Sequence, residues 1–316
     1  MIKLSIAIPT YARKQMLLKT LESIKPQLCC GVEIVVSDNG SQDGTYEMLS
    51  KLNMPLRITG FCENQGIDAN IVNVIQQAQG AYVLLFSDDD LFMEGFLEKL
   101  LAVLENPYDV VVLNHFAFTQ DPHKPLTPCF LPKKDEEFFD QEKFFRYVGL
   151  GFLSSLVFKK ELAIPYFSKV RFGKECAHVD IVARIVLDPK TRCYFAGSLS
   201  VAARSLEVPR YAMMNSCVIF LHELYQELAQ EKKLSLCSYL YFHYKLVFKE
   251  VPRIYYKLLL QDPIKAKLAA QDVLKYFQDP LSKSFIFALK LIPAALSLGI
   301  FKLLHRIVQR KRLKKF

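Results

Sequence analysis

Apolar and polar residues alternate in blocks along the first 115 residues of the chain. Five short apolar runs have the length and composition of buried strands, at residues 2–8, 33–37, 56–61, 81–86 and 109–113. Between them, apolar residues recur every three or four positions, which predicts helices at residues 13–25, 43–52, 68–79 and 93–105. This alternation with short loops predicts an α/β fold with a mostly parallel sheet flanked by helices.

Three consecutive aspartates, Asp88, Asp89 and Asp90, follow directly on the apolar run 81–86. The carboxyl end of a buried parallel strand is where open α/β sheets bind ligands. Three carboxylates placed there repel one another and lose hydration, so a cation should offset them. The pattern favours a divalent ion that is held by carboxylate oxygens and bridges to a diphosphate. The alternative is a solvated acidic turn that caps a helix beginning near Met93.

Polar loops also follow the first three predicted strands. They are Pro9–Arg13, Asp38–Thr45 and Glu63–Asn70. Asp38 ends its strand, where an acid can accept hydrogen bonds from a base or a ribose, although Ser41 and Asp43 are better explained as caps of the next helix. Neither G-x-G-x-x-G nor a Walker-type G-x-x-x-x-G-K is present, which argues against hydride transfer and P-loop chemistry.

Length and composition fit one large α/β domain with a smaller appendage. The 316 residues are 51% hydrophobic and include 24 Phe. The eight cysteines form no C-x-x-C pair, and the chain opens on a strand pattern rather than a signal peptide, so we expect reduced thiols in a cytoplasmic protein.

The net charge is +9, but seven Lys or Arg lie within 302–316, which leaves a charge near +2 on the rest of the chain. We therefore expect no nucleic-acid partner.

The four strand-end motifs, in their order, resemble glycosyltransferase family 2, inverting enzymes of the GT-A fold. The resemblance covers about residues 1–190. Ile8–Arg13 is similar to the first-strand signature, with Ala where Asn is usual, and Asp38–Thr45 is similar to the D-x-x-S-x-D-G-T loop. Glu63–Gly66 looks like the R-N-x-G turn, with Glu where Arg is usual, and Ser87–Asp90 stands at the D-x-D metal motif, with Ser first.

The resemblance implies a nucleotide-sugar site with a divalent metal, Mn²⁺ or Mg²⁺. Its expected nucleotide-binding residues are Pro9, Thr10, Tyr11, Arg13, Asp38, Asn39, Asn64, Gly66, Asn70 and Asp88. The expected metal ligand is Asp89, supported by Asp88 and Asp90. Such an ion neutralises a departing diphosphate.

The acceptor hydroxyl needs a general base, which the resemblance places within Lys174–Arg184. Gly151–Lys160 looks like the acceptor-side strand of the family. The usual Glu-Asp pair is not present in its expected form, but aligning Arg184 with the helical arginine of the family puts His178 in the place of the catalytic Asp, with Asp180 as second candidate. An imidazole titrates near neutrality. The alternatives are a helix-start His178 contacting backbone and a solvated first-turn Asp180.

The chain beyond residue 205 has a different pattern. We expect domains at 1–205 (GT-A), 206–280 (helical, with aromatic residues in the core) and 281–316 (an amphipathic, basic tail). Ser284–Phe301 is borderline in length for a bilayer, and Lys290 near its middle is costly there. We expect peripheral attachment to the inner face of the plasma membrane, with a soluble terminal helix as the alternative.

The sequence thus predicts a metal-dependent, inverting hexosyl- or deoxyhexosyltransferase. It would move a sugar from a nucleotide donor to a hydroxyl of a lipid-linked glycan in cell-surface polysaccharide synthesis, in the manner of enzymes that add side sugars to lipopolysaccharide O-antigen. One alternative is a polyprenyl-phosphate sugar synthase, whose phosphate acceptor needs no strong base. The other is an inactive scaffold that binds a nucleotide sugar, since Ser87 and the altered base region depart from the family pattern.

Overall fold

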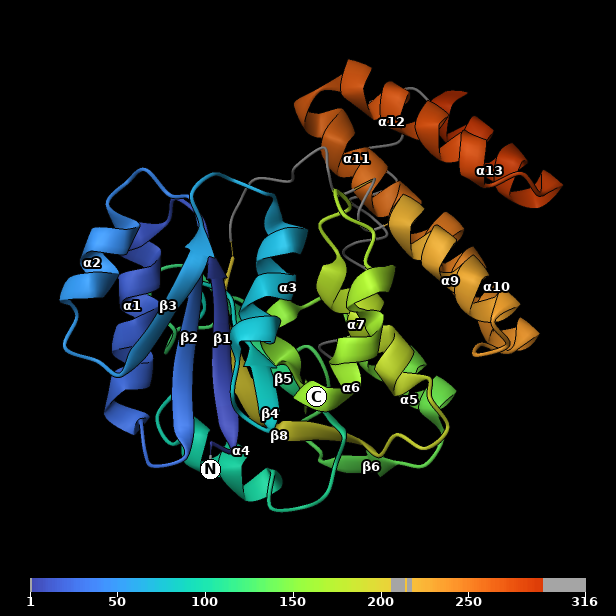
Figure 1. Cartoon of the computed structure of the whole chain (residues 1–316). Coiled ribbons are helices and arrows are strands. Elements are labelled where there is room, and N and C mark those ends of the chain that lie inside the picture. Colours follow the sequence, from blue (N-terminus) through green and yellow to red (C-terminus); the bar gives the residue numbers. More distant parts are fainter. Residues whose placement is uncertain (1, 206–213, 215–217, 292–316) are drawn as a thin grey trace. The chain divides into compact units, whose positions relative to one another are not determined.

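The computed structural model describes residues 2–205, 214 and 218–291 (Figure 1). The chain divides into two compact units, Met1–Leu206 and Glu207–Phe316, and each is described by itself.

The first unit is built on an eight-stranded sheet in the order β3-β2-β1-β4-β7-β5-β8-β6. Its strands are β1 (Leu4–Thr10), β2 (Val32–Asn39), β3 (Leu56–Phe61), β4 (Tyr82–Leu85), β5 (Val110–Phe118), β6 (Glu136–Phe138), β7 (Leu156–Lys159) and β8 (Cys193–Arg204). Strand β7 is antiparallel to both of its neighbours, β4 and β5, and β6 is antiparallel to β8. All other pairs are parallel, so the predicted mostly parallel α/β sheet is confirmed.

The helices of this unit connect the strands. They are α1 (Lys14–Ile24), α2 (Thr45–Lys51), α3 (Ile67–Gln77), α4 (Phe96–Val103), α5 (Gln141–Val148), α6 (Lys160–Ala163) and α7 (Ala177–Val186), with 3-10 turns η1 (Lys25–Gln27), η2 (Leu153–Ser155) and η3 (Ile164–Lys169). The four helices expected between the first five strands are confirmed. Helix α4 starts later than expected because Gly95, at φ 69°, holds a left-handed turn before it.

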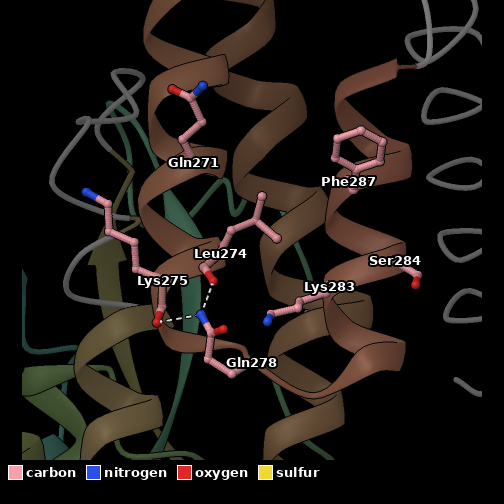
Figure 2. Close-up of a pocket in the computed structure, with 7 residues that line it drawn as sticks. All are labelled: Gln271, Leu274, Lys275, Gln278, Lys283, Ser284 and Phe287. Carbon is pink, nitrogen blue, oxygen red and sulfur yellow. Dashed lines mark hydrogen bonds between the residues drawn. The ribbon is translucent and has the colours of Figure 1, made fainter.

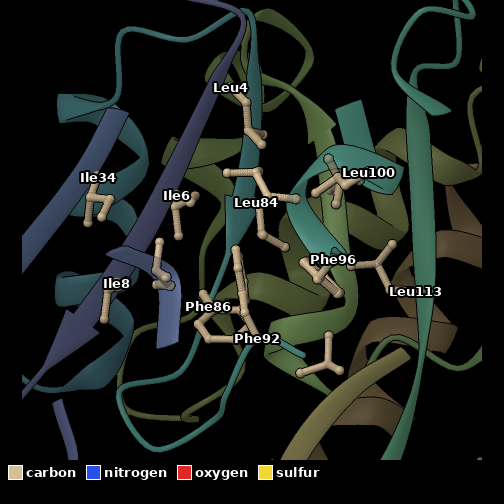
Figure 3. Close-up of a cluster of buried hydrophobic side chains, with 14 of the residues drawn as sticks. Leu4, Ile6, Ile8, Ile34, Leu84, Phe86, Phe92, Phe96, Leu100 and Leu113 are labelled. Atoms are coloured by element: carbon tan, nitrogen blue, oxygen red, sulfur yellow. The ribbon is translucent and has the colours of Figure 1, made fainter. Parts of the chain in front are cut away.

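The strand β1 lies inside the molecule along its whole length. All seven of its residues are buried, as expected for a central parallel strand covered on both faces. Figure 3 shows Ile6 and Ile8 in one cluster with Leu84, Phe86 and Phe96. This packing fixes the end of β1, and with it the loop that begins at Thr10.

The second unit is helical, as predicted. Its described helices are α9 (Phe220–Gln230), α10 (Leu236–Lys245), the π-helical η5 (Leu246–Glu250), α11 (Val251–Gln261), α12 (Pro263–Tyr276) and α13 (Pro280–Leu291). The expectation that its aromatic residues form core is confirmed for Phe242, Tyr255, Tyr256 and Phe277, which are all buried.

The predicted membrane tail is described only at its beginning. Helix α13 covers its first residues, and 292–316, with most of the basic cluster, lie outside the described residues. Over the part of the chain that is described, every helix is too short or too polar to cross a bilayer. The tail and the domain boundary at 280–281 remain predictions.

Candidate active site

The predicted motifs meet at one edge of the sheet. Strands β1, β2, β3 and β4 are parallel, and the register places Thr10 opposite Asp38 and Asp38 opposite Gly60. Strand β5 runs in the same direction as β4, because β7 is antiparallel to both, and β8 is parallel to β5. The ends of β5 and β8 therefore reach the same edge as the nucleotide-binding motifs.

The aspartate triplet is buried. Asp88, Asp89 and Asp90 are 4%, 7% and 2% exposed, so the alternative of a solvated acidic turn is wrong. The Arg13 guanidinium donates from Nη1 to Asp88 Oδ1 at 3.0 Å and to Asp89 Oδ2 at 3.2 Å. Thr10 Oγ1 donates to Asp88 Oδ2 at 2.7 Å. Burial raises the pKa of Asp88, while Arg13 acts against that rise, so the protein itself supplies part of the cation expected here.

Asp90 faces different partners. Its Oδ2 accepts from Ser154 Oγ at 2.6 Å, and its Oδ1 accepts from the backbone N–H of Arg204 at 2.8 Å. Ser154 Oγ in turn accepts from the backbone N–H of Ser87 at 2.8 Å. Burial and the neighbouring Asp89 raise the pKa of Asp90 to about 7. Asp90 thus joins the end of β4 to η2 and to the end of β8, and its role as supporting metal ligand remains a prediction.

The asparagines predicted to bind nucleotide hold the loops together. Asn39 Nδ2 donates to Asn64 Oδ1 at 2.8 Å and to the Gly66 carbonyl at 3.2 Å. Asn70 Nδ2 donates to the Thr10 carbonyl at 3.1 Å. Asn39 and Asn70 are buried and fix the shape of the loops, whereas Asn64 and Gly66 are exposed. The predicted role of these residues in nucleotide binding stays a prediction.

Asp38, near the end of β2, and Tyr11, just after β1, both lie at this edge, but Asp38 is buried at 6% exposure. Asp38 Oδ1 accepts from the hydroxyl and the backbone N–H of Ser41. A Cβ on Gly60 would lie 1.9 Å from the Asp38 carbonyl oxygen, so only glycine lets β3 approach Asp38 this closely. Tyr11 is 45% exposed, which leaves its ring accessible. The N-cap of α2 is Gly44, without a side-chain cap, so the expected capping of this helix by Ser41 or Asp43 is wrong. Asp43 instead accepts from the backbone N–H groups of Thr45 at 3.1 Å and Lys14 at 3.0 Å.

The first base candidate, His178, lies in the first turn of α7 and is 7% exposed. Neither ring nitrogen has a hydrogen-bond partner among the residues that the structure describes. Burial lowers the pKa of His178 to about 4, while the Gly151 backbone and Asp68 act in the opposite direction. The side chain is therefore neutral at pH 7. The Gly151 backbone lies close enough to the imidazole to affect it, and the role of His178 as the base stays a prediction.

The second base candidate, Asp180, is engaged by two arginines. It is 1% exposed and pairs with Arg184 Nε at 3.2 Å and Arg171 Nη2 at 3.6 Å. The alternative of a solvated first-turn acid is wrong, because burial encloses the carboxylate completely. To act as a base, Asp180 would have to give up these ion pairs. Breaking a buried ion pair is costly, because it leaves an uncompensated charge inside the protein.

A residue that sequence reasoning did not place in the site is Asp68, in the first turn of α3. Its Oδ2 accepts from the backbone N–H groups of Lys174 and Glu175 at 3.0 and 2.9 Å, and its Oδ1 accepts from Ala177 at 2.9 Å. Asp68 is 2% exposed. It fixes the loop before α7, and therefore His178, against the nucleotide half of the sheet. Its sequence pattern suggested only the start of a helix.

A pocket of about 540 Å³ lies in the second unit, between α12 and α13 (Figure 2). It is lined by Gln271, Leu274, Lys275, Gln278, Lys283, Ser284 and Phe287. None of the predicted site residues lines it. Within the described ranges, no cluster of three or more His, Cys, Asp or Glu side chains is arranged to hold a metal by itself.

Comparison with known sequences places the strand-end motifs in a family. Residues 5–154 match the model described as glycosyl transferase family 2. The chain is 28% identical over 226 residues to the abequosyltransferase RfbV of Salmonella typhimurium, covering 64% of this chain and 66% of the relative. It is 35% identical over 110 residues to the GalNAc(5)-diNAcBac-PP-undecaprenol beta-1,3-glucosyltransferase of Campylobacter jejuni, covering 34% of this chain and 36% of the relative. The predicted resemblance is confirmed.

Solved structures share the fold. TarS (residues 1–349) of S. aureus superposes with a TM-score of 0.64 at 16% identity, covering 95% of this chain and 91% of TarS. The mannosyltransferase PcManGT of Pyrobaculum calidifontis, solved with GDP-Man and Mn²⁺, gives a TM-score of 0.53 at 14% identity. The superposition covers 93% of this chain and 84% of PcManGT. The predicted GT-A-type fold is confirmed.

Proposed function

We propose that this chain, whose residues 5–154 are a family 2 glycosyltransferase domain, transfers a hexose or deoxyhexose from a nucleotide donor to a hydroxyl of a lipid-linked glycan, with inversion and with a divalent metal. The observation that carries the proposal is the buried pair Asp88 and Asp89, bridged by Arg13 at the carboxyl edge of the sheet. The names of the Salmonella and Campylobacter relatives support a role in cell-surface glycan synthesis.

The donor nucleotide would lie across the ends of β1 and β2. Tyr11 offers an exposed ring for the base, and Asp38 offers carboxylate oxygens for polar groups of the nucleoside. The Arg13 side chain is 28% exposed, so its remaining N–H groups can reach a diphosphate while Nη1 holds the aspartates. Solved complexes of TarS with UDP and UDP-GlcNAc support a nucleotide sugar as ligand of this fold.

Asp89 fits a hard divalent cation better than Asp90 does. Asp88 and Asp89 share one guanidinium, so this pair carries a net negative charge when both carboxylates are ionised. Both carboxylates already accept two hydrogen bonds, Asp89 from the side chains of Ser87 and Arg13 and Asp90 from Ser154 and the Arg204 backbone. A metal at Asp89 would replace side-chain donors only, whereas one at Asp90 would also have to displace a backbone N–H. An ion bound at Asp89 would take its other oxygen ligands from the diphosphate and water, and would stabilise the charge of the leaving nucleotide.

His178 is the stronger of the two base candidates. It is neutral at pH 7 and has an unused nitrogen, so it can accept the proton of the acceptor hydroxyl as that oxygen attacks the anomeric carbon. Attack from the side opposite the nucleotide inverts the anomeric centre. Asp180 is held by two arginines and would act mainly by positioning α7.

A lipid-linked acceptor would bring the enzyme to the inner face of the plasma membrane. The second unit exposes large apolar side chains on its helices, among them Leu236, Ile264, Leu281 and Phe287, at 54–73%. Lys275 and Lys283 line the pocket beside Phe287, which suits an anionic lipid headgroup. Flotation with vesicles of phosphatidylglycerol, compared with vesicles of phosphatidylcholine alone, tests this attachment.

The nucleotide and the metal are tested together by thermal shift. UDP, GDP, CDP and dTDP are each added with and without Mn²⁺ to the wild type, to Asp89→Ala, and to Asp272→Ala as an exposed control. A ligand at a hundred times its Kd adds about 2.7 kcal/mol to stability. We expect one nucleotide to stabilise only with metal and only with Asp89 intact.

Two other outcomes would redirect the assignment. Binding of nucleotide without donor consumption in membrane extracts would favour the inactive scaffold. Unchanged turnover in His178→Ala and Asp180→Ala would favour a phosphate acceptor, as in a polyprenyl-phosphate sugar synthase. The absence of any shift with the four nucleotides would contradict the transferase proposal.

A further inference from the structure

Three aromatic rings pack together where β5 reaches the active edge, two of them stacked and the third tilted. His115 lies 4.9 Å from Phe130 between ring centroids, at an interplanar angle of 17°, and 4.3 Å from Phe152, at 35°. The backbone N–H of Phe130 donates to the His115 carbonyl at 2.8 Å, which fixes the loop beside the strand. We call His115, Phe130 and Phe152 the aromatic platform.

The platform is tied to the aspartate triplet through a short stretch of chain. Phe152 immediately precedes η2, and Ser154 within η2 donates to Asp90 and accepts from the Ser87 backbone. Only one residue separates Phe152 from Ser154. The rings therefore lie beside the site proposed for the reacting sugar, on the side away from β1 and β2.

Open space lies beside Gly151, the residue that precedes Phe152. Gly151 is exposed and would meet no heavy atom within 4 Å if it carried a Cβ. The Gly151 backbone is also the group that acts on His178, whose ring nitrogens are unused within the described chain. The platform, the open space and His178 thus adjoin one another along this loop.

The rings are apolar and partly exposed. Phe130 is 52% exposed, in contrast to Phe86 and Phe118, which are fully buried near the same sheet edge. Burial lowers the pKa of His115 to about 4, so its imidazole is neutral and stacks as an aromatic ring rather than as a cation. Together the exposed Phe130 and the half-buried His115 and Phe152 form one contiguous aromatic surface, and contiguous apolar surface is a feature of ligand-binding sites. A pyranose suits it, because one face of the sugar presents C–H groups to the rings while its hydroxyls remain solvated.

We propose that the aromatic platform of His115, Phe130 and Phe152 binds a pyranose ring of the acceptor glycan and presents its hydroxyl toward His178. This inference rests on the proposed transferase function. The competing ligand for stacked rings is the nucleobase of the donor. The position beyond β4, on the side of β5 and β8, favours the acceptor, because Tyr11 and Asp38 lie at the opposite part of the sheet.

The test uses simple sugars and the full chain. Methyl glycopyranosides of glucose, galactose, mannose and rhamnose are screened by saturation-transfer NMR with wild type, Phe130→Ala and Phe152→Leu. Phe139→Ala is the matched control, since Phe139 is 85% exposed and lies outside the platform. The nucleotide thermal-shift screen is repeated on every variant, and melting temperatures confirm folding.

We expect at least one glycoside to receive saturation through the C–H protons of one face in the wild type and in Phe139→Ala. The signal should fall fivefold or more in Phe130→Ala, with the nucleotide shift unchanged. Retained signal in both platform variants would overturn the inference, and so would the absence of any glycoside signal in a wild type that binds nucleotide. Loss of the nucleotide shift in Phe130→Ala would assign the rings to the donor. If no nucleotide binds the wild type, the transferase proposal fails, and the glycoside arm still decides the platform.

Discussion

The buried carboxylate of Asp68 is expected to control the conformation of the loop that carries His178. It accepts three backbone N–H groups, from Lys174, Glu175 and Ala177, at 2.9–3.0 Å. Glu175 has φ 60°, a left-handed conformation that costs a non-glycine residue about 1–2 kcal/mol. The three hydrogen bonds to one charged group offset this strain and hold the start of α7 in place.

The cost of removing the carboxylate follows from these contacts. Each buried N–H left without an acceptor costs about 1–3 kcal/mol. Three such groups set the upper limit of the loss in Asp68→Ala. Entry of water and relaxation of the loop reduce it, so we expect the free energy of unfolding to fall by about 3–5 kcal/mol. Asp68→Asn keeps one acceptor oxygen but turns its amide NH₂ group toward at least one backbone donor. We therefore expect its free energy of unfolding to fall by about 1–3 kcal/mol.

The assay must separate loosening of the loop from general unfolding. Hydrogen exchange of the amides of Lys174, Glu175 and Ala177 in Asp68→Asn should accelerate tenfold or more, while amides of β1 keep their protection. Acceptor-dependent transfer should fall further than nucleotide binding. The control is Asp140→Asn, because Asp140 is an exposed N-cap that accepts one N–H, from Lys143 at 2.9 Å, and Asn caps equally well. Unchanged exchange in Asp68→Asn would refute the reasoning.

Three other substitutions test further parts of the first unit. Gly60→Ala should destabilise by about 2 kcal/mol or more and weaken nucleotide binding, because its Cβ would collide with the Asp38 carbonyl; an unchanged urea midpoint would contradict this. Ser154→Ala should lower the free energy of unfolding in urea by about 1–3 kcal/mol, because it removes a hydrogen-bond donor from the buried Asp90. An unchanged free energy of unfolding would argue against a stabilising role of this hydrogen bond. The pKa of His178 falls from 6.5 to about 4 on folding, so wild type should lose about 2 kcal/mol between pH 7 and pH 5, as the unfolded state takes up the proton. His178→Gln should lack that part of the loss, and equal losses in both proteins would show that His178 is not responsible.

The donor half of the site could be predicted because its contacts follow from local chain order. Consecutive βα units with parallel strands bring every strand end to one edge, so Thr10, Asp38 and Asp88 had to meet there once the strands were recognised. The three-to-four residue periodicity placed the intervening helices for the same reason.

The part of the site proposed for the acceptor could not be predicted from these patterns. The antiparallel β7 inserts between β4 and β5, and nothing in its short apolar run shows its direction. Ser154 and Arg204 meet Asp90 across 64 and 114 residues of chain, so no local motif marks them. Asp68 has the ordinary pattern of a first-turn acid, and only the fold reveals the three N–H groups that surround it.

The hydrogen bond between Asp90 and the backbone of Arg204 has a consequence for how the protein is made. Synthesis from the ribosome delivers the donor half first, as a run of local βα units that can pair as they emerge. Asp90 must wait for 114 more residues before its Oδ1 receives a donor. A chain that ends at residue 154, where the family match stops, would carry all four donor motifs and still leave this buried acid half satisfied. This edge of the sheet is therefore complete only after β8 has docked beside β5, so the part of the site proposed to bind the acceptor is among the last to form as the chain grows.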